Sequence, residues 1–509
     1  MTGRPRHPGD ASGNPSWQAR PPARVSVTPS APVTPQQNPP FEHPSYQHVW
    51  PPHYTAMGWR APQPPPPNRR RGWMVVFALA LLGLVGLVPL AASHQEPAST
   101  ATRAPAGQGG AVAGGQGGVD PSTQFTTGDV ADLLTRYADA LRGYNRPAFL
   151  ALLDQSNTKL VAAQRRLFNN LRQVDLQTFQ YVPVDTSLPQ LDPLHPGSYT
   201  EGWSQAWRLI QIRGIDPRPG GQYFQVRLKA SQGRLLISDI TPSLGPGANR
   251  QPMPWDVSTL RVIRGQNVVV AGTADVAAQL GDVMRDAEAA IADAGPCWPP
   301  DWQRTFTIFA TGDRATFDAW FRSRFTSTEF IGFEVGLPVV GTDGQVVSGA
   351  EDDIPQVVVD VPGARRAPLG FRALLEHELT HAASGAQRNP ETETWAVEGY
   401  ADFVAFHNGT LRQANRGGMA YRTYHAPGGL TVRLPTNRDF YGKGAALNYD
   451  LAFYAVWYLR VRYGQAAVIA WFHDANSGGN AGGLLEERFH LTVQQFVRDW
   501  AKWTFTQLK

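Results

Sequence analysis

Hydrophobic and polar positions divide the 509-residue chain into stretches of different character. Residues 1–71 contain 18 of the 43 prolines, few large aliphatic side chains and no periodic pattern, so we expect a disordered tail. Residues 72–92 follow, and from Trp73 to Ala92 they are apolar without a single charge. A helix of about 20 such residues is about 30 Å long and matches the hydrocarbon core of a bilayer. The pattern therefore predicts a transmembrane helix.

The charges beside this helix predict its orientation. Arg69, Arg70 and Arg71 precede it directly, and the next Lys or Arg after it is Arg103. Because positive charge stays on the cytoplasmic side, the tail is expected in the cytoplasm and the remainder of the chain outside it. A cleavable signal peptide is the competing interpretation, since small residues stand at 91–93, but the length of the segment and its position favour a retained anchor.

After a linker at 93–127 rich in Gly, Ala, Gln and Pro, the pattern predicts a small α+β domain at 128–245. A second short helix holds Phe149, Leu152 and Leu153, and alternating strands such as 224–228 follow and end at 237–241. Helices followed by antiparallel strands resemble the NTF2-like cone fold. Such a domain could bind a ligand or partner, but we favour the interpretation as a membrane-proximal spacer. The apolar face of the first helix comprises Val130, Leu133, Leu134, Tyr137, Ala138 and Leu141.

The last region, 255–509, also contains both strand-like and helix-like patterns of apolar residues. Its expected strands are 268–270, 306–309 and 356–361, and its expected helices are 275–291, 314–321 and 368–385. Beyond these elements the chain is expected to be mostly helical, ending with a helix over 491–500. The sequence thus predicts an α+β class with a helical C-terminal part.

The helix at 368–385 carries His377-Glu378-Leu379-Thr380-His381. Side chains four residues apart on a helix project from one face, so both imidazoles can bind one metal ion while Glu378 reaches a water bound to it. Apolar residues around the motif predict burial, and buried ionisable groups without partners are costly unless a cation stabilises them. The alternative is a pair of partly exposed histidines on an ordinary helix.

A third ligand is expected on a neighbouring helix. Glu398 lies 17 residues after His381, which leaves enough chain for a turn and a second helix, and Asp402 is one helical turn beyond Glu398. Asp402 could accept a hydrogen bond from the second nitrogen of a metal-bound imidazole; a solvated helix face is the alternative for both. Competing carboxylates that we rank lower, because their positions fit less well, are Glu376, Glu391 and Glu393.

The spacing HExxH, then ExxxD with Gly after the Glu, resembles the gluzincin metallopeptidases, in particular the peptidase MA-like family. The resemblance implies a zincin-type catalytic domain with a mixed sheet and an active-site helix. It also implies that His377, His381 and Glu398 bind Zn²⁺, that Glu378 is the general base, and that Asp402 orients a zinc-bound imidazole.

The resemblance extends to the helix at 449–459, where the family often has a tyrosine aimed at the cleft. Tyr449 is our first candidate for stabilising the oxyanion, with plain core packing as the alternative, and His425 in a Gly-rich loop is the second. Peptidases of this class hold an extended substrate against the edge strand before the active helix. The strand at 356–361 is placed for that role, although an interior position is equally allowed.

Charge and cysteine content add little chemistry. The net charge is +4, and no basic stripe with interleaved aromatic residues occurs in the last two regions, so nucleic acid is not an expected partner. Cys297 is the only cysteine, so disulfides do not stabilise the chain. The proline-rich tail is either a solvated linker or a site for a cytoplasmic partner that recognises polyproline.

The sequence therefore predicts a single-pass membrane protein with an extracytoplasmic zinc metallopeptidase domain that cleaves protein or peptide substrates outside the membrane. The alternative belongs to another class: a membrane-tethered binding or scaffold protein that retains the peptidase fold without turnover. An intact Glu378 favours the enzyme, because a scaffold has no chemical need for that base.

Overall fold

The computed structural model describes residues 125–195, 198–243, 252–320, 331–347, 353–385, 389, 391–414, 416–441 and 444–509. All of these residues belong to one unit of the chain. The tail and transmembrane helix predicted at 1–71 and 72–92 lie outside the described residues, as does nearly all of the predicted linker. Among the helices that are described, none is long and apolar enough to cross a bilayer.

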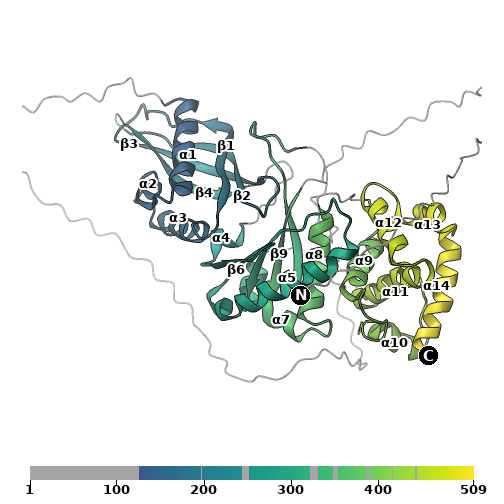
Figure 1. Ribbon diagram of the computed structural model, residues 1–509. Helices are drawn as coiled ribbons and strands as arrows, with labels where there is room; N and C mark the ends of the chain where they lie inside the picture. Colours follow the sequence, from purple (N-terminus) through teal and green to yellow (C-terminus); the bar gives the residue numbers. More distant parts are fainter. Residues whose placement is uncertain are drawn as a thin grey trace, which may run out of the picture. The chain divides into compact units, whose positions relative to one another are not determined.

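The N-terminal part, residues 125–243, places three helices against a four-stranded antiparallel sheet whose strands lie in chain order (Figure 1). The six apolar residues predicted to line the first helix are all buried, and the side chain of Thr126 caps that helix. The elements are α1 (Thr127–Arg142), α2 (Arg146–Ala151), α3 (Thr158–Leu171), β1 (Leu176–Ser187), β2 (Gly202–Ile212), β3 (Gly220–Ser231) and β4 (Arg234–Pro242).

Two local expectations for this part were wrong or incomplete. Leu152 and Leu153 do not belong to the second helix, because α2 ends at Ala151 and Leu153 instead forms a bridge with Ile237 of β4. The long helix α3 was not predicted at all.

The C-terminal part, residues 252–509, combines a five-stranded mixed sheet with helices, the last of which gather at the C-terminal end (Figure 1). The predicted α+β class and helical C-terminal part are confirmed. The strands are β5 (Arg261–Arg264), β6 (Val268–Gly272), β7 (Phe306–Thr311), β8 (Gly332–Leu337) and β9 (Ile354–Asp360). The helices are α4 (Pro254–Val257), η1 (Ala274–Gln279), α5 (Leu280–Ala294), η2 (Gly295–Cys297), α6 (Arg314–Trp320), α7 (Val361–Arg366), α8 (Phe371–Gly385), α9 (Thr394–Phe406), α10 (Gly418–His425), α11 (Ala445–Tyr463), α12 (Gln465–Asn476), α13 (Ala481–Phe489) and α14 (Val493–Leu508).

The strand order β5-β6-β7-β9-β8 corrects the proposed substrate strand. β9 is an interior strand, parallel to β7 on one side and antiparallel to β8 on the other, and all its residues are buried. It cannot offer a free edge to a peptide, whereas β8 lies at the edge of the sheet. Two helix boundaries also shift, since Val361 begins α7 and Pro368 lies in the turn before α8.

Both faces of β9 are covered. Val357 and Val359 belong to the apolar core that includes α5 and α8. Val358 belongs to a second core, which also contains Phe309, Trp255 of α4 and the interior of the N-terminal part. Because successive side chains of a strand point to opposite faces, one strand joins the two cores.

The connection between the two parts is also polar. Asn170 of α3 donates hydrogen bonds to the carbonyls of Trp255 and Ser258 and accepts one from the amide of Leu260. The buried guanidinium of Arg208 in β2 pairs with both carboxylate oxygens of Asp256, at 2.7 and 2.8 Å. Helix α4 is therefore bonded to the N-terminal part before the chain enters the second sheet.

Candidate metal centre

Helix α8 is buried on almost every side, including its charged motif. His377 is 6% exposed, Glu378 7% and His381 5%. The helix lies between the sheet and the C-terminal helices, where Trp298 donates a hydrogen bond from Nε1 to the hydroxyl of Thr380. The interpretation of the two histidines as residues of a half-solvated surface helix does not hold in this structure.

Three side-chain atoms converge beside α8. His377 Nε2 lies 3.0 Å from His381 Nε2 and 3.2 Å from Glu398 Oε2, and His381 Nε2 lies 3.3 Å from that same oxygen. Two atoms bound to a tetrahedral zinc ion at about 2.0–2.1 Å are about 3.3 Å apart. The observed triangle matches this spacing to within a few tenths of an ångström.

The donor set also fits a cation chemically. The His377 Nδ1 atom faces Asp402 Oδ1 at 2.9 Å, and a proton on Nδ1 leaves Nε2 with a free lone pair toward the triangle. Among the described residues, His377, His381 and Glu398 are the one group of His, Cys, Asp and Glu side chains whose atoms converge in this way. All three are buried, and a positive ion would stabilise them together.

The pKa shifts of His377 and Glu398 also indicate that the site favours positive charge. Burial disfavours the charged imidazole, but hydrogen bonds to Asp402 and Glu398 outweigh it and raise the pKa of His377 to about 10. Burial raises the pKa of Glu398, yet the neighbouring His381 and His377 bring it well below its ordinary value. The surrounding carboxylates thus favour positive charge at the triangle.

Asp402, fully buried on α9, connects His377 to the guanidinium of Arg416, which the sequence analysis did not predict at the site. Its Oδ1 atom accepts a 2.5 Å hydrogen bond from Arg416 Nη2 in addition to the contact with His377 Nδ1. Burial opposes ionisation of Asp402, but the nearby Arg416 charge lowers its pKa. Asp402 therefore stays a carboxylate, able to orient the imidazole.

Glu398 is held from the other side by Tyr441, whose hydroxyl donates a 2.5 Å hydrogen bond to Oε1 and leaves Oε2 for the triangle. The glycine after Glu398 has a packing role. A β-carbon on Gly399 would lie 2.4 Å from the carbonyl oxygen of Ala452, so a side chain there would push α9 away from α11.

Glu378 is not part of the triangle. It lies beside Gly332 of β8, where an added β-carbon would be 3.1 Å from Glu378 Oε1. Burial raises the pKa of Glu378 to about 7, although the neighbouring His377 acts in the opposite direction. A carboxyl group with that pKa can take up and release a proton near neutral pH.

The two candidates for stabilising the oxyanion, Tyr449 and His425, lie in different places. The Tyr449 ring, on α11, is centred 6.5 Å from the His377 ring, and the Arg416 guanidinium lies over it at 5.7 Å. His425, at the end of α10, instead has its Nε2 atom 3.3 Å from the carbonyl oxygen of Leu508. The structure brings Tyr449 to the site and His425 to the C-terminal helix.

The three competing carboxylates, Glu376, Glu391 and Glu393, lie outside the group of converging ligand atoms. Glu376 pairs with Arg372 at 3.2 Å, and Glu393 accepts hydrogen bonds from the first amides of α13. Glu391 lies exposed in the turn before α9. None of the three belongs to the convergent group, and their lower rank as ligands stays a prediction.

Arg416 and Tyr441 were missed because no spacing rule points to them. Both come from the long connection between α9 and α11, whose described residues form one helix, α10. An Arg and a Tyr in such a segment carry no sequence signal of their own; their role depends on the path of the chain.

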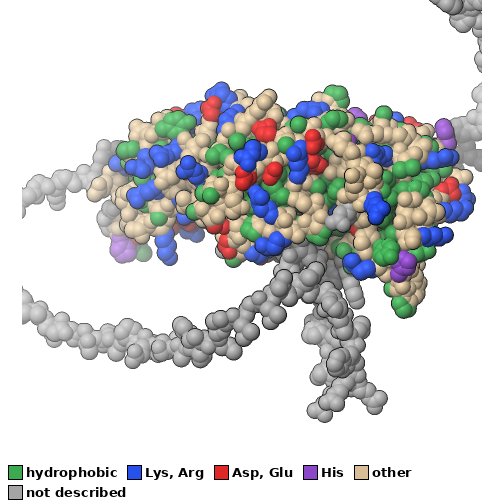
Figure 2. Space-filling model, turned by 60° about the horizontal axis from the view of Figure 1, so that its bottom comes forward, with side chains coloured by type: hydrophobic (Ala, Val, Ile, Leu, Met, Phe, Trp, Pro, Cys, Tyr) green, Lys and Arg blue, Asp and Glu red, His purple; other side chains and the backbone are tan. Residues whose placement is uncertain are grey.

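No family model matches this chain, and comparison with curated proteins found no match. The surface charge does not point to a particular partner. On the face shown in Figure 2, acidic side chains lie among the basic ones. The expectation that nucleic acid is not a partner stays a prediction.

Proposed function

We propose that this protein is a zinc-dependent metallopeptidase of the gluzincin, peptidase MA-like type. One observation carries the proposal: the ligand atoms of His377, His381 and Glu398 lie 3.0 to 3.3 Å apart. Three protein ligands of this kind leave a fourth position for water, which is typical of catalytic rather than structural zinc. Glu378 next to His377 on the same helix supplies the base that a hydrolase needs.

When bound, zinc would lower the pKa of a coordinated water and polarise the substrate carbonyl. The chain supplies the remaining chemistry. Glu378 accepts the proton of the attacking water and returns it to the leaving amine, for which a pKa of about 7 is suited. Asp402 holds the His377 ring in one tautomer, and Tyr449 is our candidate donor to the developing oxyanion.

For the substrate, the proposal moves from β9 to β8. A peptide in extended form can add a strand to a sheet edge by main-chain hydrogen bonds, with side chains alternating between two sides. β8 is the edge strand, and its first residue, Gly332, lies beside Glu378. A peptide paired with β8 would pass the catalytic base.

The finer fold assignments belong to the same proposal. A mixed sheet whose edge strand runs antiparallel to its neighbour, covered by the helix that carries the motif, supports a zincin-type domain. Helices followed by a four-stranded antiparallel sheet support an NTF2-like N-terminal part. The extracytoplasmic location rests on residues 69–92 alone and stays a prediction.

The deciding experiment uses the full-length chain. Bound metal is measured by elemental analysis, and cleavage of a mixed peptide library is measured with and without a chelator. We expect about one zinc per chain and cleavage that the chelator abolishes and added zinc restores. Zinc without any cleavage would favour the scaffold alternative, and absence of metal binding would reject both.

A further inference from the structure

We propose that the N-terminal part positions the substrate-binding strand of the site, through a hairpin that continues β8. The inference rests on the proposed function, because it concerns the strand to which we assign the peptide. The hairpin comprises residues 338–347, which begin directly after β8 ends at Leu337. Val340 pairs with Val346 across it, and the amide of Val347 donates to the carbonyl of Val339.

The hairpin is bonded to β3 of the N-terminal part. The amide of Gly221 donates a 2.7 Å hydrogen bond to the carbonyl of Pro338, and Gly220 forms an antiparallel bridge with Val339. The β8 strand is thus extended by main-chain pairing into the first sheet, so that a displacement of β3 must move the end of β8.

Apolar packing covers the same junction. Trp207, Tyr223 and Val340 form a small buried cluster, against which Val182 and Val346 also pack. The hairpin therefore lies on the strands of the first sheet, β1 to β3, rather than on its own domain. Main-chain hydrogen bonds within the hairpin and with β3 pair several of its polar groups, which lowers the cost of packing it there.

Glycines make the close approach feasible. A β-carbon at Gly221 would lie 2.4 Å from Val340 Cγ2 and 3.0 Å from a ring carbon of Trp207. A β-carbon at Gly220 would lie 2.9 Å from Leu337 Cβ, at the end of β8 itself. Any side chain at these positions would force β8 and the hairpin away from β3.

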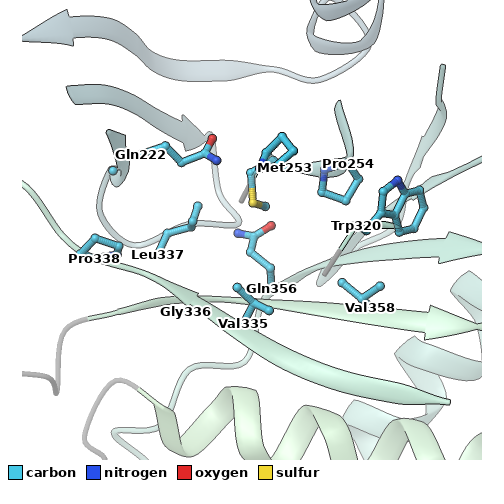
Figure 3. A pocket seen from close by; sticks show the side chains of 12 residues that line it. Gln222, Met253, Pro254, Trp320, Val335, Gly336, Leu337, Pro338, Gln356 and Val358 are labelled. Carbon is cyan, nitrogen blue, oxygen red and sulfur yellow. The ribbon is translucent and has the colours of Figure 1, made fainter. Parts of the chain in front are cut away.

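The narrow cavity beside this junction has walls from both parts (Figure 3). Gln222 of β3 and Met253 line one side, and Leu337 of β8 and Gln356 of β9 line the other. The end of β8 thus contacts the N-terminal part at its backbone, in the hairpin cluster and along the cavity.

The consequence concerns catalysis. Among the strands that the structure describes, β8 pairs with β9 alone. Edge strands with one paired side open more easily than interior strands. One end of β8 lies beside Glu378, and the other is fixed by the hairpin. The N-terminal part is therefore a positioning element for substrate, rather than a spacer.

The test compares Gly221→Ala with Gly281→Ala in the full-length chain. Gly281 lies on α5, and a β-carbon there meets no atom within 4 Å, so the control makes the same chemical change in open space. Val340→Ala, which weakens the contact without a clash, is the second variant in case Gly221→Ala does not fold. Zinc content, hydrogen exchange of residues 332–337 and peptide kinetics are measured for each.

We expect amides of β8 to exchange roughly tenfold faster in Gly221→Ala, the order of effect that overpacking produces, while Gly281→Ala stays like wild type. The KM for peptides should rise roughly fivefold or more, with zinc content and kcat retained. Unchanged hydrogen exchange of β8 in both Gly221→Ala and Val340→Ala would overturn the inference. Faster exchange with an unchanged KM would overturn it as well. If the wild type binds zinc but cleaves no peptide, the proposed function fails, and the exchange data still decide whether the hairpin holds β8.

Discussion

Gly332 of β8 and Glu378 of α8 are so close that a methyl group on Gly332 would lie 3.1 Å from Oε1 and 3.2 Å from Cγ of the glutamate. The proposed base is therefore confined by the backbone of the strand that we assign to the substrate. In the proposed function, this contact brings peptide placement and proton transfer together at one point.

Gly332→Ala should displace Glu378 by a few tenths of an ångström. Because small displacements of catalytic groups are costly, we expect kcat to fall roughly 10- to 100-fold with zinc still bound. Steady-state peptide kinetics and elemental analysis measure both quantities. Gly281→Ala is the matched control, and a kcat equal to wild type in Gly332→Ala would show that the contact does not constrain the base.

Glu378→Gln separates the base from the ligands. The amide keeps the size of the side chain but cannot accept the proton, so peptide hydrolysis should drop about 100-fold or more. Zinc should remain near one per chain, because Glu378 is outside the convergent group. Retained turnover in metal-replete Glu378→Gln protein would assign the base elsewhere.

Asp402→Ala should weaken zinc affinity or activity about 10- to 100-fold without unfolding the protein, since outer-shell partners contribute about that much. Arg416→Ala should have a smaller effect in the same direction, because Arg416 acts through Asp402. Zinc titrations of the two single variants and the double variant are compared.

The double variant should lose little more affinity than Asp402→Ala alone, because the two residues act in one chain of contacts. Arg422→Ala, an exposed arginine on α10, is the control for loss of a positive charge. Strictly additive effects of Asp402→Ala and Arg416→Ala would mean that Arg416 influences the site by another route.

Asp216, which lies between β2 and β3, predicts a pH dependence of stability. Burial raises its pKa to about 7 in the folded protein, from 3.8, although the amide of Ile212 donates to it and acts the other way. The folded state therefore holds a proton that the unfolded state releases. The stability contributed by this group is fully present below the unfolded pKa and is lost as the pH rises through about 7.

Asp216→Asn keeps an oxygen for the Ile212 amide and removes the titration. The free energy of unfolding of the variant relative to wild type should shift in its favour between pH 4 and pH 8, as the buried carboxyl of the wild type ionises. Denaturant titrations across this range, with chelator present in both proteins, measure the difference. A difference that does not vary with pH would contradict the assignment.

Strong local periodicity made some elements predictable from the sequence. The apolar face of α1 was predicted residue by residue, since a surface helix with one buried face repeats its apolar side chains at three- and four-residue steps. The convergence of His377, His381 and Glu398 was predictable as well, because helical geometry fixes the first pair. The spacing of 17 residues between His381 and Glu398 was long enough for a second helix to bring the Glu398 carboxylate back to the histidines.

The misses have a physical cause in common. β8, the run Gly-Phe-Glu-Val-Gly-Leu, has two glycines and little strand propensity, and its place at the sheet edge follows from tertiary pairing. The run of β-branched residues in β9 contained the signal for an interior strand, because a strand covered on both faces has no polar alternation. Arg416 and Tyr441 depend on the path of a long connection, which no local rule describes.

The apolar core that passes from the N-terminal helices to Phe309, Trp320 and Val358 makes the two parts of the chain complementary fragments. A chain that started near residue 252 would leave these side chains against water and would tend to aggregate. If the chain were instead split between residues 243 and 252 and both pieces were made together, each would provide the surface that the other lacks. Co-purification of the two pieces, with metal bound, is the expected result, so this protein is a natural candidate for fragment complementation.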